Sequence, residues 1–297
     1  MNNAELYRAL YLIRKFEETV LENFPKGVFP GTTHTYLGQE ANAVGVLTHL
    51  TPQDIVFSNH RGHGHFLAIG GDPRYLFAEL MGRATGICGG RGGSQHLHWK
   101  NFYSNGIQGG IIPIATGMAL AEKRKSSQAI TVAFLGDGTL GEGVIYESFN
   151  LASKWSAPIL YVLENNFIAQ TTPIHISLAG SISARFAAFE IPYSEIATSD
   201  VMVIHTEAEK LVSYVRQSQS PAALILHTQR FGPHSKGDDT RSPEELERLR
   251  SQYDPLTIHA ARLSPQERST IEAEIQTLIQ SAFSQALQDP YPPVATP

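Results

Sequence analysis

An aspartate and an asparagine each stand at the end of an apolar run that is typical of a buried strand. Asp137 lies in Gly-Asp-Gly directly after AITVAFL, and Asn166 lies in Glu-Asn-Asn directly after PILYVL. Carboxylate and amide oxygens suit Mg²⁺, which takes about six oxygens and shares them with phosphates and water. A backbone carbonyl just past Asn166, that of Ile168, is the expected third protein ligand. The pattern favours a metal ion that clamps a diphosphate.

The same stretch also matches the glycine fingerprint of dinucleotide-binding folds. Residues 136–141 read GDGTLG, and Glu164 stands near the place where such folds carry a ribose-binding acid. That fingerprint brings backbone N–H groups against a pyrophosphate, and a carboxylate inside the turn would repel it unless a cation lay between. We therefore favour the metal-diphosphate interpretation, with an NAD-binding oxidoreductase as the alternative.

Three histidines and an arginine crowd the segment NHRGHGH, residues 59–65, after another predicted strand. The spacing of His60, His63 and His65 is not a standard zinc pattern, and neither cysteine nor carboxylate accompanies it. A solvated basic turn is the alternative to a functional role. His96 and His98 alternate as residues on one strand face would, and are not candidates.

Composition is that of an intracellular enzyme subunit. The 297 residues are 42% hydrophobic and 17% charged, and the net charge of −5 argues against a nucleic-acid surface. The single cysteine, Cys88, excludes an internal disulfide. The start shows no signal-peptide pattern, and no stretch approaches the roughly 18 apolar residues of a membrane helix. We expect a cytoplasmic protein with neither nucleic acid nor membrane as partner.

Apolar periodicity predicts alternating helices and strands. Steps of three and four predict helices over residues 4–24 and 39–50, and small residues predict another over 113–123. Strands are expected at 130–135, 158–163 and 222–228. Because helices alternate with these strands, the predicted fold class is α/β, with a parallel sheet flanked by helices.

The C-terminal part changes character. Residues 230–241 are polar and without periodicity, which predicts a mobile loop. Ser242 begins one expected helix, Ser264 begins another with a capping box, and the proline-rich tail cannot be helical. We predict an α/β domain over residues 1–241, including the loop, and a helical C-terminal arm over 242–297.

Several blocks, in order along nearly the whole chain, carry a family resemblance. Together with the Gly-Asp-Gly and Asn-Asn motifs, the chain resembles the alpha subunits of thiamine-diphosphate-dependent 2-oxo acid dehydrogenases, the decarboxylating first components of pyruvate, branched-chain and acetoin dehydrogenase complexes. The segment HRGHGH is most similar to the acetoin type. The further blocks are AELYRALYLIRKFEE (4–18), GQEA (38–41), FSNHRGHGH (57–65), GGRGGSQHL (89–97), NGIQGG (105–110) and QRFGPHSKGDD (229–239).

The resemblance implies a thiamine-diphosphate-binding fold with thiamine diphosphate and Mg²⁺ as cofactors. It makes Asp137, Asn166 and Ile168 metal ligands, and His63 and His234 catalytic residues. It has Arg61 contact the diphosphate, a role that suits a guanidinium fork, and has Arg230 and Asp238 keep the active-site loop ordered. The implied cofactor-binding set is His60, Arg61, Gly106, Gln108, Gly136, Asp137, Gly138, Asn166, Ile168, Arg230 and His234.

In this family the glutamate that activates the cofactor comes from a beta subunit, and this chain contains no second half. The resemblance therefore implies an α₂β₂ heterotetramer that is inactive without its beta subunit. It implies cleavage of a 2-oxo acid or an acyloin, with transfer of the acyl or aldehyde unit to a lipoyl or other carrier domain. Alternatives are a split transketolase-like or acyloin-forming enzyme, acyl transfer to an acyl-carrier protein, and an inactive paralogue.

Three positions depart from the family or bear on its regulation. Gln108 stands where many relatives carry valine, which bears on ring packing or substrate choice. The stretch Ile196 to Asp200 lacks the first acid and the glycine of the V-D-G-N-D turn of relatives. Ser235 corresponds to a position that is phosphorylated in mitochondrial relatives.

Overall fold

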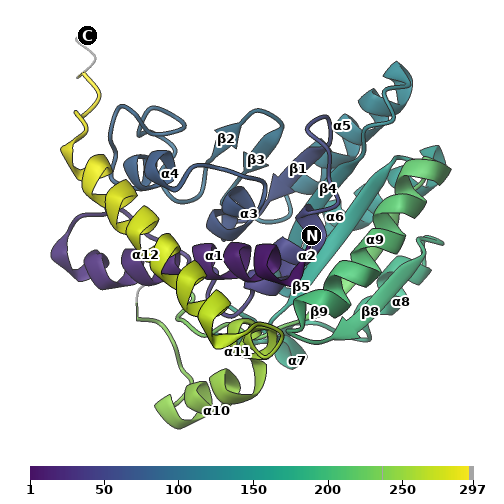
Figure 1. The fold of residues 1–297 in the computed structure, drawn as a ribbon. Helices are drawn as coiled ribbons and strands as arrows, with labels where there is room; N and C mark the ends of the chain where they lie inside the picture. Colours follow the sequence, from purple (N-terminus) through teal and green to yellow (C-terminus); the bar gives the residue numbers. More distant parts are fainter. Residues whose placement is uncertain (236, 294–297) are drawn as a thin grey trace.

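Seven strands form one sheet, in the order β2-β3-β1-β4-β5-β9-β8, in the computed structural model, which describes residues 1–235 and 237–293 (Figure 1). Neighbouring strands are parallel except β2 and β3, which pair antiparallel. The predicted α/β fold class is confirmed. The strands are β1 (Ile55–Ser58), β2 (His98–Trp99), β3 (Phe102–Ser104), β4 (Thr131–Gly136), β5 (Ile159–Asn165), β8 (Tyr193–Ala197) and β9 (Ala222–His227).

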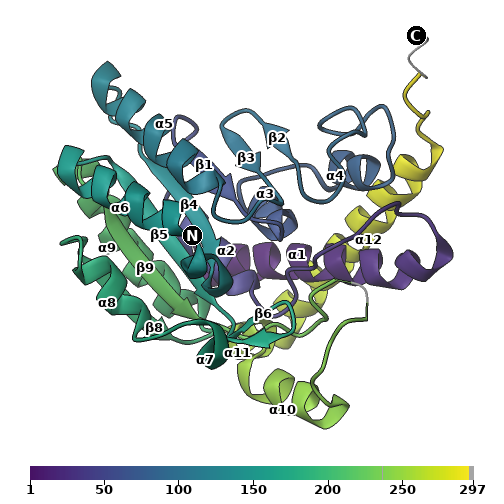
Figure 2. The same ribbon diagram turned by 180° about the vertical axis from the view of Figure 1, so that it is seen from behind.

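Helices cover both faces of the sheet, because alternate residues of the central strands are apolar on both sides. Val132 and Phe134 of β4 belong to the core shared with α1, α2, α9 and α12, whereas Ala133 and Leu135 belong to the core shared with α5, α6 and α8 (Figures 1 and 2). These helices are α1 (Asn3–Asn23), α2 (Glu40–Leu47), α5 (Ile111–Lys125), α6 (Gly143–Trp155), α8 (Ile182–Ala187), α9 (Val201–Ser218) and α12 (Pro265–Gln288).

The C-terminal helices pack onto the core that surrounds α1. Ser264 and Glu267 form the predicted capping box at the start of α12. Apolar residues four apart on α12, among them Ile271, Ile275 and Ile279, join this core, and α12 lies against α1 and α4 (Pro73–Leu80). Two shorter helices precede it, the predicted α10 (Pro243–Tyr253) and the unforeseen α11 (Pro255–Ala260). Residues 289–293 are not helical, as predicted, and 294–297 lie outside the described residues.

Several short elements were not predicted, because segments of two to eight residues hold too little periodicity. Edge strand β8 alternates between exposed and half-buried residues, so no apolar run marks it in the sequence. The others are α3 (Gly62–Ala68), α4, α7 (Ile174–Ser177), β6 (Ile168–Ala169), β7 (Thr172–Pro173), the hairpin strands β2 and β3, and the 3₁₀ turns Phe24–Lys26 and Asp137–Gly141. No helix among residues 1–235 and 237–293 is long and apolar enough to cross a membrane.

A single buried carboxylate organises the glycine-rich segment 86–93. Glu79, at the end of α4, accepts hydrogen bonds from the N–H groups of Cys88, Gly90, Gly92 and Gly93 at 2.7 to 3.2 Å. The Glu79 side chain has no exposed surface. Four charge-assisted hydrogen bonds in a buried setting make this carboxylate the anchor of a segment that has no regular secondary structure of its own.

Replacing Glu79 with alanine is expected to lower the free energy of unfolding by about 3 kcal/mol, because four buried N–H groups lose their acceptor. Trypsin is expected to cut the folded Glu79→Ala variant after the exposed Arg91, which lies in the segment that residue 79 no longer holds. Denaturant unfolding and timed proteolysis check both effects. The control is Glu147→Gln, at an exposed position on α6. If Glu79→Ala has the same free energy of unfolding as the control and is cut by trypsin at the same rate, Glu79 does not anchor the segment.

Candidate active site

Polar residues that follow four parallel strands meet at the carboxyl edge of the sheet. Arg61 follows β1, Asp137 follows β4, Asn166 follows β5 and Arg230 follows β9. The register places Gly136 opposite Glu164, and Asn165 opposite His227, so these strands end level with one another. Ligands of parallel α/β sheets bind beyond the carboxyl ends of the strands. The predicted metal and phosphate residues therefore share one edge.

The hairpin after β5 brings Ile168 to Asp137. Strands β6 and β7 pair beyond Asn166, and a Cβ on Gly138 would lie 2.6 Å from the Cβ of Ala169. Only glycine allows this approach at position 138. The backbone N–H groups of Asn166 and Gly138 act on the Asp137 carboxylate. The three predicted metal ligands thus converge around the Asp137–Gly141 turn.

The Asp137 carboxylate is buried with an unused oxygen. Its residue is 3% exposed, and Oδ2 has no hydrogen-bond partner among the described residues. Burial raises the pKa of the Asp137 carboxyl to about 6, against the lowering by nearby backbone N–H groups and Arg230. A buried carboxylate oxygen without a donor fits a site for a divalent cation.

The buried guanidinium group of Arg230 lies near this carboxylate, and that of Arg61 lies near Arg230. Arg230 is 1% exposed, and its three side-chain nitrogens have no hydrogen-bond partner within residues 1–235 and 237–293. Arg61 donates to the Thr35 carbonyl at 2.7 Å and to His234 at 3.3 Å. Burial, and then the neighbouring Arg230, lowers the pKa of Arg61 to about 9, and burial lowers that of Arg230 to about 10. Both stay charged at neutral pH.

Buried cations without partners are unfavourable unless an anion satisfies them. A Cβ on Gly136 would point into open space, at the start of the turn that carries Asp137. The unused donors of Arg230, an open glycine cradle and a carboxylate suited to a divalent cation together fit a diphosphate held with a metal ion.

Three histidines gather next to Arg61, although they come from distant parts of the sequence. The nitrogens of His34, His60 and His234 that could bind a metal lie within 4.8 Å of one another. Burial and then Arg61 lower their pKa values, to about 3 for His34, to about 4 for His234 and well below the ordinary range for His60. The neutral rings could bind a metal ion, but two guanidinium groups beside them favour an anion instead.

The sequence does not single out His34, because this residue lies in an irregular segment without a recognisable motif. Gln108 lies beside His60 and favours its charged form slightly. Gln95 is hydrogen-bonded to His34 Nδ1 at 3.1 Å, and its amide fills the space that a Cβ on Gly106 would need. The segment with Gly106 and Gln108 thus lies beside the histidine cluster, and Gln95 already explains the glycine.

The remaining histidines of segment 59–65 are buried, so the solvated-turn alternative is wrong. His63 has no exposed surface, and its Nδ1 lies 3.1 Å from a carboxylate oxygen of Glu17. His65 is also fully buried and lies 2.7 Å from Ser58 Oγ, with Nε2 3.6 Å from Glu164.

Glu164 supports the floor of the site and cannot bind a ribose. Its carboxylate is 2% exposed and accepts hydrogen bonds from the Tyr36 hydroxyl, Asn42 and Asn59. Burial alone would raise the pKa of this carboxyl, but His65 and these donors hold it below its ordinary value. Every oxygen is occupied within the core, which removes the acid that a dinucleotide site would need.

Residues 230–235 and 237–241, the described part of the predicted loop, contain no helix or strand. Within the loop, the Asp238 carboxylate accepts a hydrogen bond from the Ser235 N–H at 3.0 Å. The Arg230 side chain makes no hydrogen bond to the described part of the loop, although the charges of Asp238 and Asp239 act on it. Arg241 instead donates to the carbonyls of Arg230 and Gly232 at 2.6 and 2.9 Å. The N–H donors of the Arg230 side chain therefore remain available at the carboxyl edge of the sheet.

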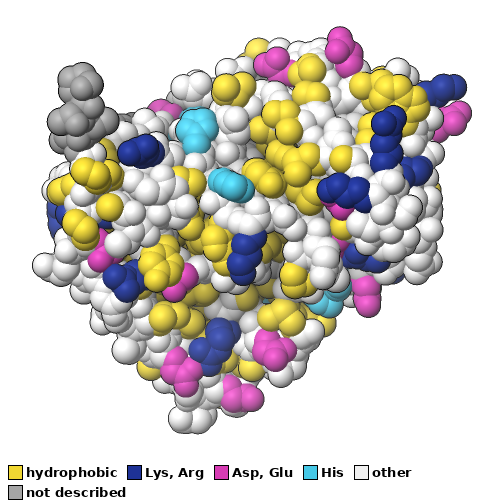
Figure 3. All heavy atoms as spheres, turned by 90° about the horizontal axis from the view of Figure 1, so that it is seen from above, with side chains coloured by type: hydrophobic (Ala, Val, Ile, Leu, Met, Phe, Trp, Pro, Cys, Tyr) yellow, Lys and Arg dark blue, Asp and Glu magenta, His cyan; other side chains and the backbone are white. Residues whose placement is uncertain are grey.

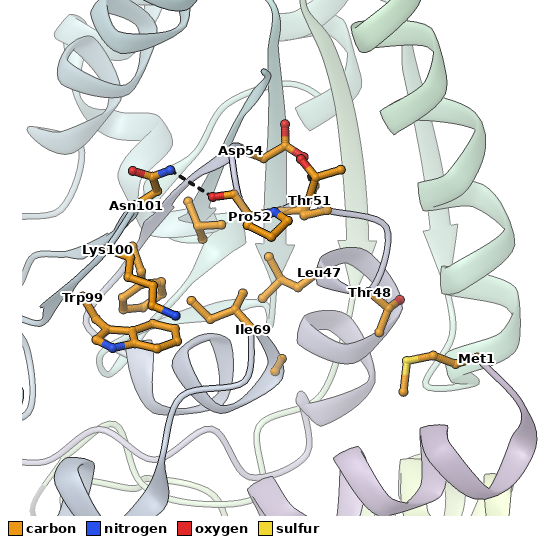
Figure 4. A pocket seen from close by; sticks show the side chains of 14 residues that line it. Met1, Leu47, Thr48, Thr51, Pro52, Asp54, Ile69, Trp99, Lys100 and Asn101 are labelled. Atoms are coloured by element: carbon orange, nitrogen blue, oxygen red, sulfur yellow. Dashed lines mark hydrogen bonds between the residues drawn. The ribbon is translucent and has the colours of Figure 1, made fainter. Parts of the chain in front are cut away.

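A separate cavity of about 350 Å³ lies at the opposite edge of the sheet. Its lining includes Asp54 and Asn101, which precede β1 and β3, and Lys100, whose ammonium lies 4.0 Å from the centre of the Trp99 ring (Figure 4). It is mostly apolar and touches none of the predicted site residues.

Fold and site together define an α/β protein whose buried charges at the carboxyl edge of a parallel sheet fit a phosphorylated ligand and a metal ion. The family described as dehydrogenase E1 component matches residues 8–295. The chain belongs to this family of thiamine-diphosphate-dependent oxidoreductases, which confirms the resemblance seen in the sequence.

Relatives of two kinds match the chain equally well. The pyruvate dehydrogenase E1 component subunit alpha of Rhizobium meliloti is 35% identical over 99% of this chain and 88% of its own length. The acetoin:2,6-dichlorophenolindophenol oxidoreductase subunits alpha of Bacillus subtilis and Cupriavidus necator are 35% and 36% identical, each over 97% of this chain and 89% and 90% of their own lengths. Identity therefore does not distinguish the acetoin type from the pyruvate type.

Proposed function

We propose that the chain is the alpha subunit of a heteromeric enzyme that cleaves a 2-oxo acid or an acyloin and transfers the acyl or aldehyde unit to a lipoyl group or another carrier. The observation that carries this proposal is that an Asp137 oxygen and the Arg230 guanidinium, both without hydrogen-bond partners among the described residues, lie at the same edge of the sheet. Asp137, Asn166 and the Ile168 carbonyl would hold Mg²⁺, and residues around them would hold thiamine diphosphate.

The chain's residues then have distinct tasks. Arg61 and Arg230 neutralise the diphosphate, with His60 and His234 as further donors or acceptors beside it. Gly136 leaves room for close approach of the diphosphate, and Gly138 leaves room for the hairpin that carries Ile168. The segment with Gly106 and Gln108 faces the rest of the cofactor. When bound, the cofactor supplies a carbanion that attacks the substrate carbonyl. His63 and His234 are the proposed catalytic histidines, which hold or move protons at that carbonyl.

A beta subunit is expected to complete the site. The carboxylates near the described site are committed, because Glu17 and Glu164 lie fully in the core and Asp238 ties the loop. The activating glutamate is therefore proposed to come from the partner, in an α₂β₂ heterotetramer. Hydrophobic side chains gather near the middle of the face seen in Figure 3. Exposed apolar residues such as Ile107 and Ile114, at 68% and 55%, support a protein contact.

Residues 1–241 carry every proposed site residue, and the arm 242–297 is proposed to brace α1 behind them. A cytoplasmic location and a lipoyl or acyl-carrier domain as acceptor also remain proposals.

Calorimetric titration of the purified chain with its beta subunit tests the cofactor assignment. Thiamine diphosphate is expected to bind only when Mg²⁺ is present, because the diphosphate and the Asp137 carboxylate repel each other without a bridging cation. NAD, at the same concentration, is the comparison ligand. Metal-independent binding of thiamine diphosphate, or tight binding of NAD, would contradict the proposal.

A further inference from the structure

Glu17, His63 and Ser94 form a continuous chain of hydrogen bonds. Ser94 Oγ lies 2.8 Å from His63 Nε2, and His63 Nδ1 lies 3.1 Å from Glu17 Oε2. Glu17 and His63 have no exposed surface, whereas Ser94 is half-buried. The three residues come from α1, α3 and the segment held by Glu79. This series of hydrogen bonds thus begins at the Glu17 carboxylate, which is buried in the core, and ends at the Ser94 hydroxyl.

The hydroxyl end faces the site. Ser94 lies between Gln95, which contacts His34, and Thr33, whose Oγ1 is 3.4 Å from Ser94 Oγ. His34 in turn packs edge-on against His60 and His234, with ring centres 4.8 Å away in both cases. The Ser94 hydroxyl therefore borders the histidine cluster where substrate is proposed to bind.

His63 differs from the other histidines there in its partner. His34, His60 and His234 all lie near the Arg61 guanidinium, which opposes a charged ring. His63 has a buried carboxylate against Nδ1. Glu17 also accepts the Tyr36 N–H at 2.8 Å, which fixes the carboxylate in place. Nδ1–H therefore donates to Glu17, and the lone pair of Nε2 accepts the Ser94 O–H.

A serine, histidine and carboxylate in this order could also form a nucleophilic triad. Such a triad needs N–H groups to stabilise an oxyanion. The nearby N–H groups of Gly90, Gly92 and Gly93 are already bound to Glu79. Because those donors are occupied, the geometry favours proton transfer over acyl transfer to Ser94.

We propose that Ser94, His63 and Glu17 form a proton relay that acts as the base for cleavage of an acyloin. The inference rests on the proposed function and specifies its substrate class. In this step the O–H bond of the acyloin carbinol breaks, and its electrons form the carbonyl of the departing aldehyde. The electrons of the adjacent C–C bond stay with the fragment retained in the site.

The released proton goes to Ser94 Oγ, while Ser94 passes its own proton to His63 Nε2. Glu17 stabilises the resulting imidazolium and is the positioning residue. Transfer of the retained fragment to a disulfide carrier consumes one proton, which resets the relay. A 2-oxo acid instead loses carbon dioxide, which carries no proton. Cleavage of an acyloin therefore needs this base, whereas decarboxylation of a 2-oxo acid does not.

The test uses the enzyme reconstituted with its beta subunit, with acetoin and pyruvate as substrates and 2,6-dichlorophenolindophenol as electron acceptor. Ser94→Ala is expected to lower kcat for acetoin by about 100-fold or more, since general bases contribute about 10²–10⁴-fold. The KM for acetoin, the kcat for pyruvate and the affinity for thiamine diphosphate should change by less than about threefold. Ser94→Thr, which keeps the hydroxyl, should recover most of the acetoin rate.

The solvent deuterium isotope effect on acetoin cleavage should fall in Glu17→Gln, because the imidazolium loses its counter-charge. Thr33→Val, a change of similar volume beside Ser94, is the packing control and should match wild type. Equal losses with both substrates in Ser94→Ala would show a structural role and overturn the relay. A wild-type enzyme that turns over pyruvate but not acetoin would overturn the relay and leave the proposed function standing. Turnover of neither substrate would also overturn the relay, whereas the proposed function fails only if no 2-oxo acid or acyloin is turned over.

Discussion

Replacing Asp137 with asparagine is expected to abolish Mg²⁺-dependent binding of thiamine diphosphate and, at the same time, to stabilise the cofactor-free chain. The first effect follows because the diphosphate loses the charged ligand of its bridging cation. The second follows from burial, which raises the pKa of the Asp137 carboxyl to about 6 from its ordinary 3.8. The folded chain thus holds that proton more tightly than the unfolded chain does.

The sign of the pH dependence follows from this difference. A carboxyl with a raised pKa in the folded state costs stability as the pH rises from about 4 to above 6. The asparagine variant carries no such charge. At pH 7.5 its free energy of unfolding should exceed that of wild type by up to about 3 kcal/mol, and the gap should narrow as the pH falls to 5.

Denaturant unfolding at both pH values, together with calorimetric titration of the cofactor, measures the two effects. Asp72→Asn is the control, because Asp72 is an exposed helix cap and asparagine caps equally well. A variant that binds the cofactor normally, or that is less stable than wild type at pH 7.5, would contradict the assignment of Asp137.

Without its beta subunit, the purified chain is expected to turn over pyruvate and acetoin at rates at least about 1000-fold below those of the reconstituted enzyme. The reason is that proton transfer by a group on the partner contributes about 10²–10⁴-fold, and its absence also leaves the site open to water. Adding purified beta subunit should restore activity with a stoichiometry of one to one.

Analytical ultracentrifugation of the same mixtures should show an α₂β₂ species. A mixture that contains Asp137→Asn in place of the wild-type chain should assemble yet remain inactive, which excludes a contaminating enzyme. Full turnover by the chain alone would refute the need for a partner.

Sequence patterns could place Asp137 and Asn166 because each directly follows a long apolar run, and strand ends in a parallel sheet share an edge. His34 could not be placed in the same way. It belongs to an irregular segment, and only the folded chain brings it beside His60 and His234. Edge strand β8 was missed for a related reason, since its half-exposed residues lack the apolar run that marks β4 and β5.

Glu17 did leave a signal. It falls four residues after Ile13 on the apolar face of α1, where a carboxylate has to find a buried partner. That partner, His63, lies in a different element, so the pattern could indicate that a partner exists but not which residue it is.

The buried charges at the sheet edge also bear on protein engineering. Asp137, Arg61 and Arg230 are buried charged groups that the cofactor-free fold would be better off without. A library selected for heat resistance in the absence of cofactor would therefore be enriched in neutral substitutions at these positions, and its most robust members would be catalytically dead. Selection with saturating thiamine diphosphate and Mg²⁺ is expected to retain these charges, because the bound ligands then stabilise the folded state that carries them.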